Sequence, residues 1–298
     1  PSWSEDLARL FPFLFPFETR HLFLQSTAFG YSRAMMRWHN SQNDDNRSDH
    51  RRDDRPILGR LQRQKVRISR SRILDSAMKV MELYGSSPSV LEVEYFEEVG
   101  TGLGPTLEFY STVSKEFSKK KLKLWRENES VHGDEYAFGK RGLFPAPMSE
   151  EQATSESGKK QLQLFKVLGK FVARSMLDSR IIDISFNPAF FRIAASSSSV
   201  APSLGTVKAV DHDLAKSLLL LKSFANAKKA VDDNRTLSKA QKTQALQQIE
   251  VGGVKVEDLS LDFTLPGYPA IELVKNGSNI PVTNENVDLY VDRVIDMT

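Results

Sequence analysis

The stretch 91–117, LEVEYFEEVGTGLGPTLEFYSTVSKEF, constrains the fold most, because three local patterns follow one another in it without a break. Val93 and Tyr95 alternate with glutamates at the two-residue period of a half-buried strand. Glycines then stand at every second position ahead of a proline, which suits a turn that leads into a helix. Beyond the turn, apolar residues recur three or four apart, as on one buried helix face: Leu107, Tyr110, Val113 and Phe117. The stretch therefore predicts a strand, a tight turn and a helix.

The turn itself, with Gly100, Gly102 and Gly104, has a functional and a structural interpretation. A glycine-rich turn ahead of a helix can bind phosphate. This one lacks a Gly-Lys-Ser/Thr ending and the G-x-G-x-x-G spacing, and glutamates surround it. We therefore interpret the three glycines as a structural hinge that lets strand and helix pack closely, and not as a nucleotide site.

The composition excludes several kinds of site. The chain has no cysteine, so it holds no disulfide and no thiolate metal ligand, and its five histidines show no ligand spacing. We predict no metal and no cofactor. The net charge of +3 is too small to indicate nucleic-acid binding, and we interpret the basic run at 119–126 as a solvated helix end.

Nothing in the sequence indicates a membrane or a secretory route. No apolar run approaches the ~20 residues that cross a bilayer. The first residues contain Pro12 and Pro16 and lack a basic segment, so they do not read as a secretory signal. We expect an intracellular protein, in the cytoplasm or the nucleus, with neither a membrane nor a nucleic acid among its partners.

Residues 99–110, VGTGLGPTLEFY, resemble the opening motif of HECT-type ubiquitin ligases, in the form typical of the thyroid-receptor-interactor and ubiquitin-fusion-degradation branch. Most other branches have G-x-D-x-G-G and one more residue before Glu-Phe-Phe, whereas this chain has Gly102 at the aspartate position and Pro105 at the second glycine. The segments 17–40, 142–147 and 165–191 are also similar to this branch. The resemblance implies the N-terminal lobe of a HECT domain over roughly residues 65–298.

Composition and periodicity divide the chain into three parts, and the class we predict is α+β and predominantly helical. Residues 1–60 form a helical extension, in which the run 43–55 has no apolar residue and is expected to be a disordered loop. Residues 61–205 form a larger helical subdomain. The small residues at 196–199 mark a boundary, and residues 206–298 form a smaller subdomain of helices and a β-hairpin.

Helical spacing predicts the main helices of both subdomains. The larger one has helices at 72–84 and 161–179. In the second of these we expect one buried stripe, formed by Leu162, Phe165, Leu168, Val172 and Met176. The smaller subdomain has helices at 213–231, with Asp213 as N-cap, and at 238–251.

The last forty residues predict strands and a final helix. Alternation over 259–265 predicts a strand, and Asn276-Gly277 predicts the primed turn of a hairpin over 271–282. Thr283 or Asn284 should cap the last helix. The chain ends within that helical pattern, which we expect to be a truncation.

In the HECT family the smaller subdomain binds a ubiquitin-conjugating enzyme in an apolar groove between helices and a strand. The resemblance assigns this role to residues of the first helix, of the strand and of the last helix: Leu214, Ser217, Leu218, Asp258, Leu259, Leu261 and Tyr290. Tyrosine stands here where the family usually has phenylalanine. Taken one at a time, Leu214, Leu218 and Leu261 are better explained as core. The run 218–221 together with Tyr290, however, exceeds what so small a unit can bury, which favours a partner site.

The reaction that the resemblance implies is transfer of ubiquitin from the conjugating enzyme to a ligase cysteine and then to a substrate lysine. The expected partners are a ubiquitin-conjugating enzyme, ubiquitin, and protein substrates bound by regions outside this chain. The family's cysteine lies in a C-terminal lobe, so we predict no catalytic residue here and expect the chain alone to be inactive. The alternative is a non-catalytic adaptor that binds a partner through the same groove.

Overall fold

The computed structural model describes residues 2–29, 33, 35, 38, 63–96, 98–126, 134–195 and 201–298. These residues are predominantly helical with a few short strands, so the predicted α+β class is confirmed. Two compact units share the chain, one made of residues 1–118 and 162–184 and the other of residues 119–161 and 185–298. The charged run at 43–55 lies outside the described residues.

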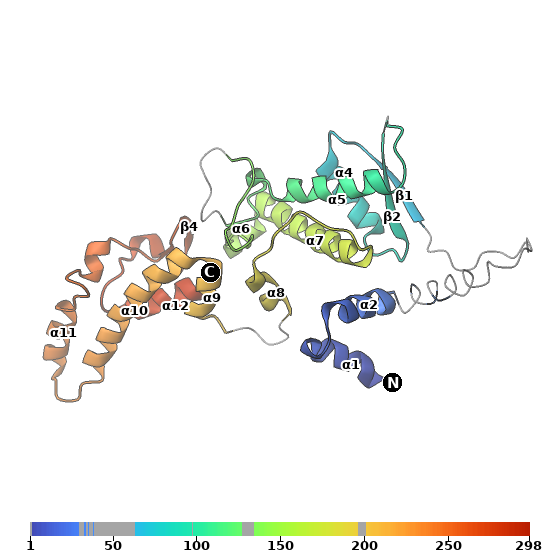
Figure 1. Ribbon diagram of the computed structural model, residues 1–298. Coiled ribbons are helices and arrows are strands. Elements are labelled where there is room, and N and C mark those ends of the chain that lie inside the picture. The colour runs from blue at the N-terminus through green and yellow to red at the C-terminus, as the bar shows by residue number, and fades with distance from the viewer. Residues whose placement is uncertain are drawn as a thin grey trace, which may run out of the picture. The chain divides into compact units, whose positions relative to one another are not determined.

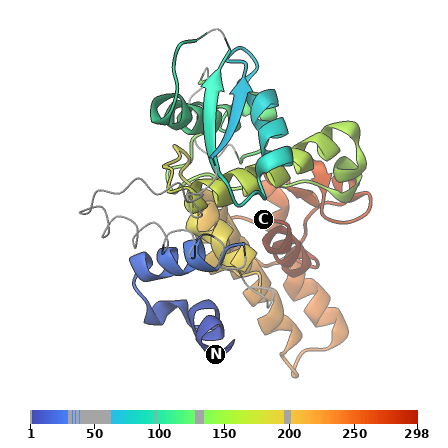
Figure 2. The ribbon, with the colours of Figure 1, turned by 90° about the vertical axis from the view of Figure 1, so that its right-hand side faces the viewer.

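The first unit combines helices with one parallel strand pair. Its elements are α1 (Ser2–Leu10), η1 (Pro12–Leu14), α2 (Phe17–Thr27), β1 (Arg63–Ile68), α4 (Ile73–Tyr84), β2 (Val90–Tyr95), α5 (Leu103–Phe117) and most of α7 (Glu156–Leu177). The two strands lie side by side in Figure 2, paired from Arg63 with Val90 to Ile68 with Tyr95. Helix α4 connects them and contacts both β1 and α5.

The predicted strand, turn and helix are confirmed as β2 and α5, joined at Gly102. This glycine is the residue before α5 and has φ 87°, a conformation that favours glycine. Thr106, in the first turns of α5, accepts a hydrogen bond from the Val93 amide at 2.9 Å and donates one to the Gly102 carbonyl at 2.8 Å. One side chain thereby holds strand, turn and helix together. Leu107, predicted to be buried, is 44 % exposed.

Strand β2 is buried on both faces, which corrects the half-buried strand expected from alternation. Glu92 and Glu94 are only 7 % and 9 % exposed. Parallel pairing sets them beside the cations of β1, with Arg67 Nε 3.1 Å from a Glu94 carboxylate oxygen and Lys65 Nζ 3.4 Å from the other. The hydrogen bond from Arg67 lowers the pKa of Glu94 despite its burial.

The core of the first unit lies between α5 and α7. Phe171 of α7 contacts the rings of Phe109, Tyr110 and Phe117, with centroids between 5.2 and 6.3 Å apart. The apolar stripe predicted for α7 does not coincide with the buried face of the helix, because Leu162 and Met176 are exposed. The buried face carries polar side chains at its C-terminal end, which an apolar pattern cannot reveal.

The second unit is built from short helices and an antiparallel strand pair. Its elements are η3 (Lys120–Leu122), α6 (Glu150–Thr154), α8 (Pro188–Ala195), α9 (Leu204–Val210), α10 (His212–Asp232), α11 (Lys239–Gln247), η4 (Val256–Leu259), β3 (Thr264–Leu265), β4 (Tyr268–Glu272), η5 (Gly277–Asn279) and α12 (Val287–Met297). The long helix α10 runs beside α12 (Figure 1). Both contribute to one apolar core, with Phe224 and Val294 fully buried in it.

The hairpin of this unit lies elsewhere than predicted. β3 and β4 pair around Pro266 and Gly267, whose φ is 81°. Gly277 instead begins a 3-10 turn, and a Cβ on it would lie 2.3 Å from the Phe263 carbonyl oxygen. That glycine is therefore needed for close backbone approach and not for a hairpin turn. The predicted strand at 259–265 is reduced to β3, because Leu259 belongs to η4 and Ser260, with φ 50°, interrupts the extended backbone.

The helix starts also shift by a few residues. Asp211, not Asp213, caps α10, since its carboxylate accepts the Leu214 amide at 2.9 Å. Asn286, not Thr283 or Asn284, precedes α12. None of the helices in the described part of the chain has both the length and the apolar character needed to cross a bilayer.

Candidate functional site

The second unit contains a cavity of about 1270 Å³. Its lining comes from residues 123–126 and 138–146, from the end of α9, from α10, from residues 261–268 and from α12. All of these residues belong to the second unit. The cavity is thus a feature of one compact unit.

Part of the cavity lining is apolar, and several of these apolar residues belong to α10. Asp211 caps α10 and so fixes where this helix starts. Residues three or four positions apart then lie on one face of the helix. We define the apolar floor as Leu214, Leu218, Leu221, Leu261 and Tyr290. Ser217 also lines the cavity, at its exposed edge, and donates to the Asp213 carbonyl at 3.2 Å.

Tyr290 is the aromatic residue of the apolar floor and is deeply buried. It is 1 % exposed, and its ring meets that of Phe263 edge-on at 5.4 Å between centroids. Burial, with a smaller contribution from the nearby Asp262 carboxylate, raises the pKa of Tyr290 to about 12. The hydroxyl therefore stays neutral at physiological pH, and the floor carries no charge of its own.

The cavity brings together most of the predicted docking residues, namely Leu214, Ser217, Leu218, Leu261 and Tyr290. Asp258 and Leu259 do not line it. Both belong to η4, where the Asp258 carboxylate accepts the Lys255 amide at 3.2 Å and Leu259 packs against the core.

The predicted surplus of exposed leucines is smaller than the sequence indicated. Leu218 and Leu221 are buried in the core of the second unit. Only Leu219 and Leu220 remain exposed, at 51 % and 43 %, and neither lines the cavity.

Four cationic side chains also line the cavity, and the sequence alone did not identify them as a group. We define the basic wall as Lys123, Arg126, Lys140 and Arg141. The run containing Lys123 and Arg126 had been interpreted as a solvated helix end, yet Arg126 is only 4 % exposed. The signal that could have found the wall is the basic pair at 140–141 inside an otherwise apolar, glycine-flanked patch.

Arg126 is the buried member of the basic wall. Its guanidinium lies 5.3 Å from the ring centroid of Tyr268 and 3.8 Å from an Asp211 carboxylate oxygen. Burial lowers the pKa of Arg126, although Tyr268 and Asp211 counteract it. Its Nε and Nη1 atoms have no hydrogen-bond partner among the described residues. The cation is thus buried and incompletely neutralised.

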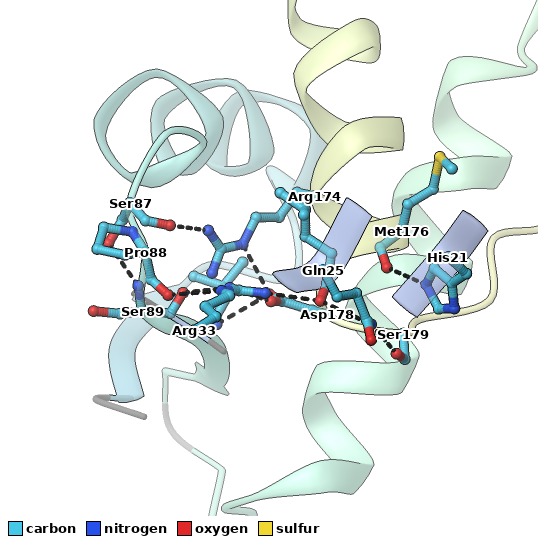
Figure 3. A network of polar contacts seen from close by, with 12 residues as sticks. His21, Gln25, Arg33, Ser87, Pro88, Ser89, Arg174, Met176, Asp178 and Ser179 are labelled. Carbon is cyan, nitrogen blue, oxygen red and sulfur yellow. Dashed lines mark hydrogen bonds and ion pairs between the residues drawn. The ribbon is translucent and has the colours of Figure 1, made fainter. Parts of the chain in front are cut away.

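The first unit holds a buried polar network of a different character, centred on Asp178 (Figure 3). One carboxylate oxygen is 2.8 Å from Arg33 Nη2, and the other is 2.8 Å from Arg174 Nε. The second oxygen also accepts the Leu91 amide at 3.2 Å. Both arginines are 1 % exposed, so the carboxylate is shielded from solvent on every side.

The same network anchors the N-terminal segment. Arg33 also donates to the carbonyls of Pro88 and Leu177, at 2.9 and 2.7 Å. From α2, Gln25 donates to Ser179 Oγ at 2.7 Å, and a His21 ring nitrogen lies 2.8 Å from the Met176 carbonyl (Figure 3). Because every partner is satisfied within the fold, we assign this cluster a structural role.

Comparison with known proteins adds the family. The HECT-domain (ubiquitin-transferase) family matches residues 111–298. The chain is 42 % identical over 302 residues to a probable ubiquitin fusion degradation protein of Schizosaccharomyces pombe, covering 100 % of this chain and 16 % of the relative. It is 42 % identical over 313 residues to ubiquitin fusion degradation protein 4 of Saccharomyces cerevisiae, covering 99 % and 19 %.

A third relative is the E3 ubiquitin-protein ligase TRIP12 of Danio rerio, 38 % identical over 303 residues, covering 99 % of this chain and 15 % of the relative. The chain thus spans less than a fifth of the length of these relatives. The family match covers more than half of the chain, and it includes the whole apolar floor and the whole basic wall. The chain therefore belongs to the HECT-domain (ubiquitin-transferase) family.

Proposed function

We propose that the second unit recruits a ubiquitin-conjugating enzyme for a HECT-type ubiquitin ligase, with the apolar floor as its docking site. The observation that carries the proposal is the convergence of Leu214, Leu218, Leu261 and Tyr290 on one cavity. These positions are separated in sequence, and the family resemblance assigns conjugating-enzyme contacts to all of them. Family membership and the names of the relatives support ubiquitin transfer as the activity of the whole protein.

The physical basis of docking is burial of an apolar side chain of the partner against the floor. Such burial releases about 25 cal/mol for each Å² removed from water, and a few anchors carry most of the binding energy. The conjugating enzyme would then present its ubiquitin thioester to a ligase thiolate. These 298 residues contain no cysteine, so we assign them recruitment and no covalent step. Substrates would be bound by other regions, and we place the reaction in the cytoplasm or the nucleus.

Titration of labelled conjugating enzymes with the 298-residue chain tests the docking site. Leu261→Ala removes a half-buried floor residue and should weaken binding by roughly 1–2 kcal/mol, because the partner loses part of its apolar pocket. Leu220→Ala, on the same unit but outside the cavity, is the matched control and should change binding by less than ~0.5 kcal/mol. Tyr290 is unsuitable for this test, because truncating a residue that is 1 % exposed also costs folding stability.

The outcomes separate clearly. If no conjugating enzyme in a broad panel binds, the docking assignment is wrong. Weakening by Leu220→Ala with no effect of Leu261→Ala would move the interface from the cavity to the exposed face of α10. In the same samples, a charged conjugating enzyme should leave no reducible ubiquitin adduct on the chain, and such an adduct would contradict the recruitment-only role.

A further inference from the structure

We propose that the basic wall of the cavity recognises a carboxylate on the docked protein segment, next to the apolar side chain that fills the floor. This inference rests on the proposed function, since it names what the docking partner must carry. It adds an electrostatic requirement to an apolar one. The ligand class is therefore an acidic protein loop, and not an apolar loop of any sequence.

The first observation behind this inference is the balance of charged side chains in the cavity lining. Among the cations of the lining, Lys123, Lys140 and Arg141 are exposed and Arg126 is buried. The acidic side chains of the lining are Asp211 and Asp213. The Asp211 carboxylate is already engaged as the cap of α10, through the Leu214 amide. Four cations against two carboxylates still leave the lining with a net charge of +2, which favours an anionic ligand.

The second observation is the incomplete pairing of the Arg126 guanidinium. Its only ion pair among the described residues is the 3.8 Å contact with Asp211, which is longer than a hydrogen bond, and two of its nitrogens have no partner there. A buried cation that is incompletely paired is costly, and its field is weakly screened because little water surrounds it. A carboxylate that enters the cavity would offset this cost without contacting Arg126 directly.

The size of the cavity indicates what kind of ligand brings that carboxylate. A volume of about 1270 Å³ exceeds the range of roughly 300–1,000 Å³ that is usual for small-molecule sites. The lining combines an apolar floor, neutral because Tyr290 stays protonated, with four cationic side chains. A protein loop with an apolar residue beside an aspartate or glutamate matches both kinds of lining residue at once.

Charge reversal on the basic wall tests the inference. The double variant Lys123→Glu, Lys140→Glu alters two exposed side chains and should retain the fold. We expect it to weaken conjugating-enzyme binding about tenfold at low ionic strength, mainly through a slower association rate, and to lose most of that effect near 1 M salt. The double variant Lys222→Glu, Lys239→Glu makes the same change of net charge at two exposed lysines outside the cavity, so it is the control and should bind like the wild type.

A charge swap sharpens the test. Replacing acidic residues of the conjugating enzyme's docking loop by lysine should weaken binding to the wild-type chain and restore it to the double variant. Unchanged affinity of the double variant, with Leu261→Ala still weakening binding, overturns the carboxylate inference and leaves the docking site intact. Absence of any binding by the wild type overturns the docking site itself.

Discussion

Gly102 shows how a single residue sets the geometry of the first unit. Its φ of 87° is the only positive one among the three glycines of the turn. A Cβ at this position would meet nothing within 4 Å. Space is therefore not the constraint, and any cost of a side chain at Gly102 comes from backbone conformation alone.

Gly102→Val should lower the free energy of unfolding by about 1–3 kcal/mol, because a β-branched residue is strained at positive φ. Gly104→Ala is the matched control: it lies in the first turn of α5 with open space around it and should stabilise by about 0.4–1 kcal/mol. Urea denaturation followed by circular dichroism measures both. A valine variant with the wild-type midpoint would show that the turn relaxes to ordinary geometry.

At the scale of elements, the β1–β2 pair depends on matched charges. Both glutamates of β2, Glu92 and Glu94, are buried. The pairing register aligns Lys65 with Glu92 and Arg67 with Glu94, so each carboxylate has a cation opposite it. The Glu94 carboxylate binds Arg67 and Lys65 in its ionised form, so its protonation weakens the strand pair. The pair therefore links the stability of the first unit to pH.

The pH dependence has a definite sign. The folded-state pKa of Glu94 lies below its ordinary value, so its stabilising contribution is present above about pH 4 and is lost as the pH falls through the folded value. Glu94→Gln should therefore flatten the decline of the melting temperature below pH 4. Thermal melts of wild type and variant between pH 3 and pH 7 measure this, and parallel curves would contradict it.

Local patterns predicted those elements whose determinants are local. The strand, turn and helix of 91–117 follow from alternation, glycine spacing and helical periodicity, and all three are present. The hairpin was misplaced, because Asn276-Gly277 is a strong local turn signal, whereas Gly277 is needed for contact with the distant Phe263 backbone. A competing long-range contact cannot be read from a short window.

At the scale of the molecule, the docking residues could be named through the family resemblance, but the basic wall could not. Leu214 and Tyr290 are carried over position by position, and the cavity contains both. Lys123 and Lys140 reach the cavity from segments that precede α10 by more than seventy residues. Their role depends on tertiary placement, which charge and periodicity along the chain do not encode.

The Asp178 network connects three segments that are far apart in sequence. The carboxylate pairs with Arg33, with Arg174 and with the amide of Leu91. The buried guanidinium groups of Arg33 and Arg174 pair with the same buried carboxylate, so both lose their anion if the charge of Asp178 is removed. The first unit consequently has one polar centre at which the N-terminal segment, β2 and α7 meet.

Asp178→Asn should destabilise the first unit by about 3–5 kcal/mol, because it leaves two buried guanidinium groups without an anion. Asp75→Asn is the control, since that carboxylate pairs with Arg72 at the surface, and should cost less than ~1 kcal/mol. Differential scanning calorimetry of the whole chain separates the two. Equal melting profiles of the two variants would show that the buried cluster relaxes by admitting water.

The division of each unit between two chain segments has a consequence for the order of synthesis. When residue 118 leaves the ribosome, the rings of Phe109, Tyr110 and Phe117 still lack Phe171, and Arg33 still lacks Asp178. The nascent first unit must therefore keep an apolar face exposed until residues 162–184 emerge, after a segment of the other unit has already been made. That interval is when this chain most needs protection from aggregation.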